Sequence, residues 1–206
     1  MNIPTKATAL NLRAALAVIL PMTTPSVPQP EYWLRGPLPE VPPLLQPVAH
    51  ALLQARAEVQ AALHNFPDHL LPVRPAGVAS VGFHLRHLAG VLSRMQAYAR
   101  QQPLTDEQFR FLAAEKDGPS DPETTAALVQ QFSEAVEQLL AMLRTTPEAI
   151  LTEFRPVGRQ GLPSTVIGLL VHAAEHTTRH TGQLLVTARV VQAGQAAYDA
   201  GSPSIH

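Results

Sequence analysis

Four long segments with the hydrophobic period of an α-helix follow one another after Pro47, and they restrict the chain to an all-α fold. The predicted helices cover residues 48–66, 80–101, 120–145 and 163–192. A shorter helix is predicted over residues 105–116, opened by the capping box Thr105-x-x-Gln108. Period-two alternation is absent, so residues 147–162 are expected to be irregular. Four long helices with connections of unequal length are typical of a helix bundle.

Apolar side chains recur every three or four residues along the first three long segments, which predicts one buried face on each helix. The predicted core side chains are Leu45, Val48, Leu52, Ala55, Val59, Ala62, Phe66, Val81, Leu85, Leu88, Leu92, Met95, Leu128, Phe132, Ala135, Leu139 and Met142.

The two ends of the chain differ from this helical region. Ten of the 20 prolines fall within the first 47 residues, so we expect residues 1–39 to be an extended or partly disordered extension on the bundle surface. Residues 1–21 resemble a non-essential extension more than a signal peptide, because Arg13 interrupts the apolar run and no A-x-A site follows. The bundle is expected over residues 40–192, followed by a loose tail over residues 193–206.

Charge and cysteine content exclude several classes of function. The formal net charge is −1 and no run of Lys or Arg occurs, so neither nucleic-acid nor membrane binding is expected, and the chain is expected to be cytoplasmic. The absence of cysteine excludes disulfides and thiolate metal sites. A metal would therefore be held by imidazole, carboxylate or water, which favours Zn, Ni, Fe or Mn over Cu(I).

Five of the nine histidines crowd into two windows, residues 84–87 and residues 172–180. His176 and His180 are four residues apart, so on a helix they differ by only ~40° in azimuth and ~6 Å in rise and point the same way. Burying two imidazoles costs free energy unless a partner satisfies them. The last helix carries a 3,4,3,4 stripe that predicts seam positions for these histidines and for Gln183, and its members are Val166, Leu169, Ala173, His176, His180, Gln183, Thr187 and Val190.

The helix over residues 80–101 carries a second polar stripe, one residue off its apolar face, made of His84, His87, Val91, Arg94 and Tyr98. One ligand from this stripe would complete a three-histidine site with the pair on the last helix. On spacing alone, a metal site and a set of hydrogen-bonded core histidines are about equally compatible with these residues.

Both windows resemble the signature of the DinB-like (YfiT/DinB) superfamily. Its first block is matched by Ser80-Val81 followed by His87-Leu88, and its second by His176-x-x-x-His180-x-Gly182-Gln183. The resemblance spans residues 40–192 and implies an up-down-down-up four-helix bundle that holds one divalent metal ion, Zn or Ni first and Fe or Mn next. It implies the ligands His87, His176 and His180, with Gly182 permitting close helix packing and Gln183 beside the ligands.

The remaining polar residues leave alternatives open. His84 and His172 are candidates for a fourth ligand or for a structural role, although His172 and His180 lie ~80° and ~12 Å apart on an ideal helix. Arg94 and Tyr98 are candidates for a substrate pocket. Arg155, Arg159 and Arg179 are candidates for binding an anionic substrate, with solvated arginines as the simpler interpretation. Glu175 points ~100° away from His176 and is expected at the surface.

The resemblance also implies candidate functions. Some members of the superfamily are thiol-dependent S-transferases or isomerases that use a low-molecular-weight thiol such as bacillithiol or mycothiol. We therefore expect a metal-dependent transferase or hydrolase with a small-molecule substrate, and a homodimer; no catalytic residue is assigned. The alternative is a non-catalytic metal- or ligand-binding bundle with a stress-related role. An open coordination position would favour the enzyme, whereas a fourth protein ligand would favour the alternative.

Overall fold

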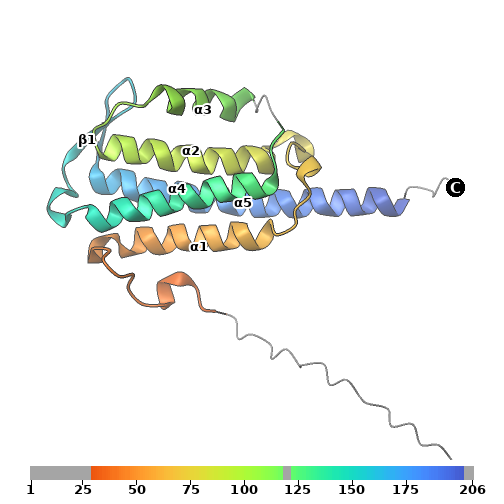
Figure 1. The fold of residues 1–206 in the computed structure, drawn as a ribbon, viewed down its shortest axis with the longest axis horizontal. Helices are drawn as coiled ribbons and strands as arrows, with labels where there is room; N and C mark the ends of the chain where they lie inside the picture. Colours follow the sequence, from red (N-terminus) through yellow and green to blue (C-terminus); the bar gives the residue numbers. More distant parts are fainter. Residues whose placement is uncertain (1–28, 118–121, 202–206) are drawn as a thin grey trace, which may run out of the picture.

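The computed structural model describes residues 29–117 and 122–201, so residues 1–21 lie outside the described part. It contains four long helices, one shorter helix and a small hairpin (Figure 1). Their bounds are α1 Gln46–Ala62, α2 Val81–Ala99, α3 Asp106–Asp117, α4 Thr125–Thr145, β1 Phe154–Val157, β2 Leu162–Thr165 and α5 Val166–Gly201. Single turns of 3-10 helix occur at Tyr32–Leu34, Pro43–Leu45, Asp68–Leu70, Pro75–Gly77 and Glu148–Ile150.

The four long helices form the predicted up-down-down-up bundle. In Figure 1, α1 and α5 run in one direction, whereas α2 and α4 run in the other. Both α1 and α2 pack against α4 and α5, so the order around the bundle is α1–α4–α2–α5. The parallel pair α2 and α4 requires a long connection, and α3 supplies it by running back along α2 (Figure 1).

The core agrees with the apolar stripes predicted for the first three long helices. Leu52 in α1, Leu88 in α2 and Phe132 in α4 are fully buried, and every residue of the predicted core listed above except Ala62 is buried. Ser80 begins α2 by accepting a hydrogen bond from the amide of Phe83 at 3.2 Å, as a helix N-cap does. These contacts hold α2 rigidly inside the bundle.

The capping box predicted at the start of α3 is present. The amide of Thr105 donates to Oε1 of Gln108 at 2.9 Å, and the amide of Gln108 donates to Oγ1 of Thr105 at 3.2 Å. The predicted start of α4 at residue 120 is four to five residues early, because Thr124 is the N-cap and its hydroxyl accepts from the amide of Ala127. Residues 120 and 121 themselves lie outside the described part.

The buried face of α5 differs from the predicted stripe. The central buried positions are one residue further on, at Leu170, Thr177, Thr181 and Leu184, whereas Gln183 is exposed. The helix packs on both α1 and α2, so its buried face is wider than a single 3,4 stripe. The predicted seam positions of Gln183 and Val190 are therefore wrong.

The last helix is longer at its C-terminal end than predicted. Helix α5 continues to Gly201, so the loose tail predicted from residue 193 is helical over residues 193–201. At the other end, residues 29–39 lie on α1, where the amide of Tyr32 donates to Oε1 of Gln54 at 3.1 Å. His50 Nε2 lies 3.0 Å from the carbonyl oxygen of Gly36.

A two-stranded antiparallel hairpin occupies part of the region predicted to be irregular. Strand β1 pairs with β2 in a register that sets Phe154 opposite Thr165. Arg155 is buried and its Nε donates to the carbonyl oxygen of Ala99 at 2.8 Å, which ties the hairpin to the end of α2. With only four residues each and Pro156 opposite Pro163, the strands are too short for a period-two pattern to show. Within the described ranges, no helix has both the length and the apolar character to cross a membrane.

Candidate metal centre

His87 lies in the second turn of α2, and its ring is held from both sides. On one side it stacks on Phe83, with ring centroids 5.3 Å apart and planes 11° from parallel. On the other side it faces α5. The side chain is half-buried. The N-cap at Ser80 defines where α2 begins and therefore which face of the helix His87 occupies.

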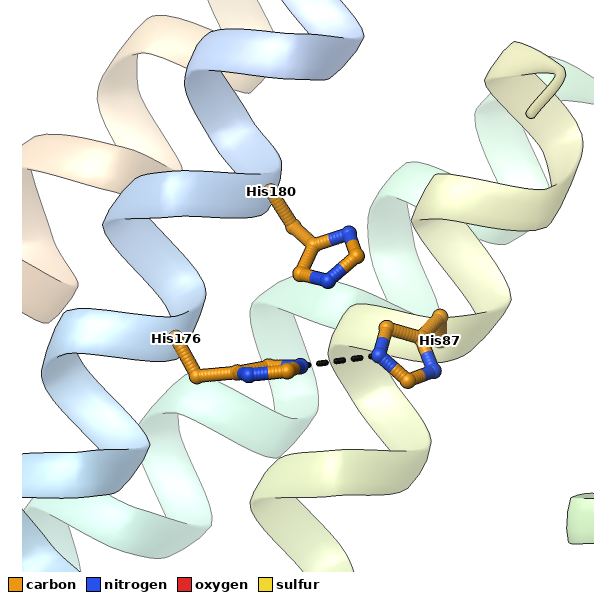
Figure 2. Close-up of side chains that lie close together, drawn as sticks. All are labelled: His87, His176 and His180. Atoms are coloured by element: carbon orange, nitrogen blue, oxygen red, sulfur yellow. Dashed lines mark hydrogen bonds between the residues drawn. The ribbon is translucent and has the colours of Figure 1, made fainter. Parts of the chain in front are cut away.

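Three histidine rings from α2 and α5 converge on one small space (Figure 2). His176 and His180 lie on successive turns of α5, as their four-residue spacing predicts, and His87 reaches toward them from α2. One nitrogen from each ring lies within 4.8 Å of the other two. The Nε2 atoms of His87 and His176 are 2.8 Å apart. The structure therefore brings together the three histidines that the resemblance implied as ligands.

A carboxylate that the sequence analysis did not single out completes the surroundings of His87. Glu115, from α3, is only 5% exposed, and its Oε2 lies 2.8 Å from Nδ1 of His87. The guanidinium of Arg94 pairs with both oxygens of the same carboxylate. Arg94, a candidate for a substrate pocket, is buried in this ion pair and also lines a cavity between α2, α3 and α4. Glu115 shares one face of α3 with Gln108 and Phe111, and this 3,4 spacing was the signal that could have identified it.

The fourth histidine, His84, supports His180. It is 3% exposed, and its Nδ1 lies 3.1 Å from Nδ1 of His180. This contact occupies Nδ1 of His180 and leaves Nε2 as the ring nitrogen available to a ligand. His84 therefore contacts one of the three convergent histidines and is not a member of the group that could share one ion.

Three of these histidines are neutral in the folded protein at neutral pH. Burial lowers the pKa of His84 to about 4, with a further contribution from the neighbouring His180 and His87. Burial followed by the nearby histidines lowers the pKa of His176 to about 4, and burial followed by His87 and Arg179 does the same for His180. Neutral imidazole is the form that binds a metal ion.

At Glu115, burial and the charged partners shift the pKa in opposite directions. Burial by itself raises the pKa of its carboxyl group, but the hydrogen bonds from His87 and Arg94, together with their charges, outweigh burial and lower the pKa below the ordinary value. Glu115 is therefore ionised at neutral pH and can only accept hydrogen bonds.

His172 lies outside the convergent group of three. Its side chain is 51% exposed, and its Nδ1 lies 3.8 Å from a carboxylate oxygen of Glu175. Glu175 is also exposed and pairs with Arg179 one turn later, as predicted for a surface residue. His172, Glu175 and His176 form a second, more exposed group whose ligand atoms lie within 4.8 Å of one another. The pairing of Glu175 with Arg179 competes with metal binding there.

The other predicted pocket residues lie in different surroundings. A side chain at Gly182 would meet nothing within 4 Å, so the close helix packing expected at this glycine is absent. Gln183, expected beside the ligands, is exposed on α5. Tyr98 packs, half-buried, against the apolar core. Arg155 is buried in its contacts with Ala99 and Glu153 and does not face the site.

A cavity of about 440 Å³ lies between α2, α3 and α4. Gly90, Arg94 and Phe111 are among its lining residues, together with the amide side chains of Gln108 and Gln138. None of the three convergent histidines lines this cavity. It adjoins the contact between α2 and α3 around Arg94.

The donor set fits a divalent metal ion. Three imidazoles converge, and a partner fixes one nitrogen in each of two rings: Glu115 holds Nδ1 of His87, and His84 holds Nδ1 of His180. Metal-binding histidines are commonly oriented in this way by a contact at the other ring nitrogen. Within the described part of the chain, the buried Nδ1 of His176 has no hydrogen-bond partner, and its Nε2 faces the cluster. The fold and the site thus define a helix bundle with a three-histidine centre.

The chain belongs to the DinB superfamily, whose family model matches residues 51–184. The match includes α2, α3, α4 and most of α5, and therefore all three convergent histidines. A comparison with curated proteins found no significant match.

Two solved structures share the fold. A conserved protein from Enterococcus faecalis is 21% identical, with a TM-score of 0.58 over 73% of this chain and 98% of that chain. YfiT from Bacillus subtilis is 16% identical, with a TM-score of 0.54 over 79% of this chain and 97% of that chain. YfiT is described as a probable metal-dependent hydrolase with an unusual four-helix bundle topology. At these identities the likeness establishes the architecture, including the helix order seen in Figure 1.

Proposed function

We propose that this protein is an enzyme that binds one divalent metal ion through His87, His176 and His180 and uses it to activate a nucleophile. The observation that carries the proposal is the convergence of three imidazole nitrogens within 4.8 Å in a half-buried site. The supporting contacts of Glu115 and His84 orient two of the rings. Description of YfiT as a probable metal-dependent hydrolase supports the same class of chemistry.

The donor set favours Zn or Ni, with Fe and Mn as further candidates, because the ligands are neutral imidazoles and the chain has no cysteine. When bound, such an ion would supply Lewis-acid polarisation of a substrate and would lower the pKa of a water or thiol. Three protein ligands are the usual set in catalytic zinc sites, which keep a further position for water or substrate.

The nearest candidates for a fourth protein ligand do not close this site. His84 contacts His180 through Nδ1, and His172 is half-exposed beside Glu175. The catalytic interpretation is therefore preferred to a purely structural metal site, since a structural site is normally closed by four protein ligands.

We further propose that the reaction is transfer of a low-molecular-weight thiol to an electrophilic carbon. The new bond joins sulfur to carbon, the leaving group departs with its electron pair, and the thiol proton passes to solvent or to the leaving group. The half-buried histidines would exclude part of the solvent from this exchange. Hydrolysis, in which water replaces the thiol, is the second candidate because of the description of YfiT.

The metal site is tested by measuring metal content in protein purified without a histidine tag and then incubated with Zn, Ni, Fe or Mn. Wild type is expected to retain close to one ion per chain, and the double variant His176→Ala/His180→Ala is expected to retain none. His69→Ala is the matched control, because His69 is exposed and remote in sequence from both histidine windows. A metal-free wild type after all four incubations would refute the proposal.

The reaction is tested on the metal-loaded protein. Bacillithiol, mycothiol and related thiols are offered with an electrophilic acceptor, and formation of the S-conjugate is followed by mass spectrometry. Ester and amide substrates without any thiol test the hydrolase. Turnover that requires both metal and thiol supports S-transfer, whereas turnover with water alone favours hydrolysis.

A further inference from the structure

Among the residues that the structure describes, Glu115 is the acidic side chain that reaches the three-histidine group from another helix. We propose that Glu115 is the positioning residue of the metal centre: from α3 it holds the proton of His87 on Nδ1 and thereby directs the Nε2 lone pair toward His176 and His180. This inference rests on the proposed metal function. It adds a residue outside the histidine signature and gives α3 a role in metal binding.

The hydrogen-bond partners of Glu115 determine the direction of each bond. Arg94 can only donate, and its guanidinium engages both carboxylate oxygens. With the carboxylate an acceptor on every side, the contact of 2.8 Å to His87 requires the hydrogen on Nδ1 of His87. A neutral imidazole with hydrogen on Nδ1 has its lone pair on Nε2.

The contacts of His176 agree with this arrangement. Nε2 of His87 lies 2.8 Å from Nε2 of His176, so in the metal-free protein His176 donates to the lone pair of His87. Nδ1 of His176 is then an acceptor, and this buried nitrogen has no hydrogen-bond partner among the described residues. Figure 2 shows the two Nε2 atoms facing each other across the space that the ion would enter.

Gly90 on α2 is the reason that the carboxylate can lie so close to α2. A Cβ at residue 90 would collide with Oε1 of Glu115 and would lie 2.8 Å from both Nη1 of Arg94 and Cε1 of Phe111. His87, Gly90 and Arg94 lie on one face of α2, because they are three and four residues apart. The same face that presents the ligand therefore also receives the carboxylate and supplies its counter-charge.

Helix α3 is otherwise attached to α2 by few polar contacts. Gln108 donates from Nε2 to the hydroxyl of Ser93 at 2.9 Å and to its carbonyl oxygen at 3.2 Å. Phe111 packs against the core. These contacts hold the start and middle of α3, whereas Glu115 holds its end. Loss of the Glu115 contact is thus expected to release His87 without unfolding the bundle.

The first test compares Zn affinity by competition with a chromogenic chelator at pH 7.5. Glu115→Gln is expected to weaken binding about 10- to 100-fold, the usual effect of removing a partner that orients a metal ligand. Gly90→Ala displaces the carboxylate without removing any charge, and a similar loss is expected. Circular dichroism checks that each variant keeps its helix content.

Two control variants isolate the effect. Asp106→Asn makes the same acid-to-amide change at an exposed site in the first turn of α3. Gly194→Ala adds a methyl group to a helix at a site where a Cβ would meet nothing within 4 Å. Both are expected to keep Zn affinity within about twofold of wild type, as surface substitutions usually do. Equal affinity in wild type, Glu115→Gln and Gly90→Ala would overturn the proposal.

The second test uses long-range ¹H–¹⁵N NMR of the metal-free protein to determine which ring nitrogen of His87 carries hydrogen. Wild type is expected to carry hydrogen on Nδ1 of His87, and Glu115→Ala is expected to lose this preference. Hydrogen on Nε2 in wild type would overturn the proposal whatever the metal affinities. If wild type binds no metal, the proposed function fails, whereas the NMR result still decides whether Glu115 orients His87.

Discussion

The two helices that carry the convergent histidines support them in different ways. On α2, His87 is held by the ionised Glu115, which is itself paired with Arg94 and buried against Gly90. On α5, His180 is held by the neutral imidazole of His84, and Nδ1 of His176 has no partner in residues 29–117 and 122–201. Both supports come from another helix, Glu115 from α3 and His84 from α2, but the first carries a full charge whereas the second is uncharged.

This difference predicts an order of importance among the residues around the site. A hydrogen bond to an ionised acceptor is roughly twice as strong as one between neutral groups. His87, the ligand on α2, should therefore be the ligand that moves least when a metal binds. The α5 ligands should be the ones that adjust when a metal enters, since their partners restrain them less.

The largest effect is expected from breaking the charged support. Arg94→Met leaves Glu115 buried with His87 as its remaining partner, so the free energy of unfolding should fall by about 3 kcal/mol, the lower end for a broken buried ion pair. Urea titration of the metal-free protein measures the change. The double variant Arg94→Met/Glu115→Met should recover most of the loss but not the metal affinity. An unchanged stability in the single variant would show that the pair is not energetically important.

A smaller effect is expected from breaking the neutral support. His84→Phe removes the contact at Nδ1 of His180 and keeps a buried ring, so Zn affinity should fall about tenfold, the lower end for a residue that orients a ligand. The same chelator competition measures it. A loss larger than that of Glu115→Gln would reverse the comparison between the two helices.

The acid dependence of stability should separate the two supports. In the folded state the pKa values of His84, His176 and His180 are lowered from 6.5 to about 4. The unfolded chain therefore takes up protons first, and the stability present above pH 6.5 is lost progressively as the pH falls toward about 4. Thermal unfolding in the presence of a chelator, at steps between pH 7.5 and pH 4, measures this loss.

The variants His84→Phe and Glu115→Gln make the acid experiment specific. His84→Phe should reduce the loss between pH 6.5 and 4, because one of the three titrating groups is gone. Glu115→Gln should preserve it, since the pKa of Glu115 is lowered from 4.5 and its contribution is lost only below that value. An equal change in both variants would mean that the two supports titrate as one network.

The smallest effect is expected at His172. Its side chain is half-exposed and its nearest charged neighbour is Glu175 at 3.8 Å, so His172→Ala should change Zn affinity by less than about twofold. A tenfold loss would instead place His172 among the metal ligands, on the α5 side of the centre.

Much of the fold was predictable from sequence, because it depends on local periodicity. The apolar stripes around Leu52, Leu88 and Phe132 define which face of each helix is buried, and prolines and capping residues define most helix ends. The pairing of His176 with His180 is equally local, since four residues bring two side chains to one face of any helix. The end of α5 was missed because its sequence beyond residue 192 lacks an apolar stripe, although the helix continues to Gly201.

Contacts between helices decided the rest. The seam of α5 is centred on Leu170, Thr177 and Leu184 because α5 packs on two neighbours at once, and a single-helix pattern does not contain that information. Glu115 is an ordinary acidic residue in the sequence, 28 positions from His87. Only the return of α3 along α2, together with the missing side chain of Gly90, brings its carboxylate to the imidazole. The sequence by itself determined the helices and the three histidines, whereas tertiary packing decided which group orients each ring, because such contacts join residues that no local pattern connects.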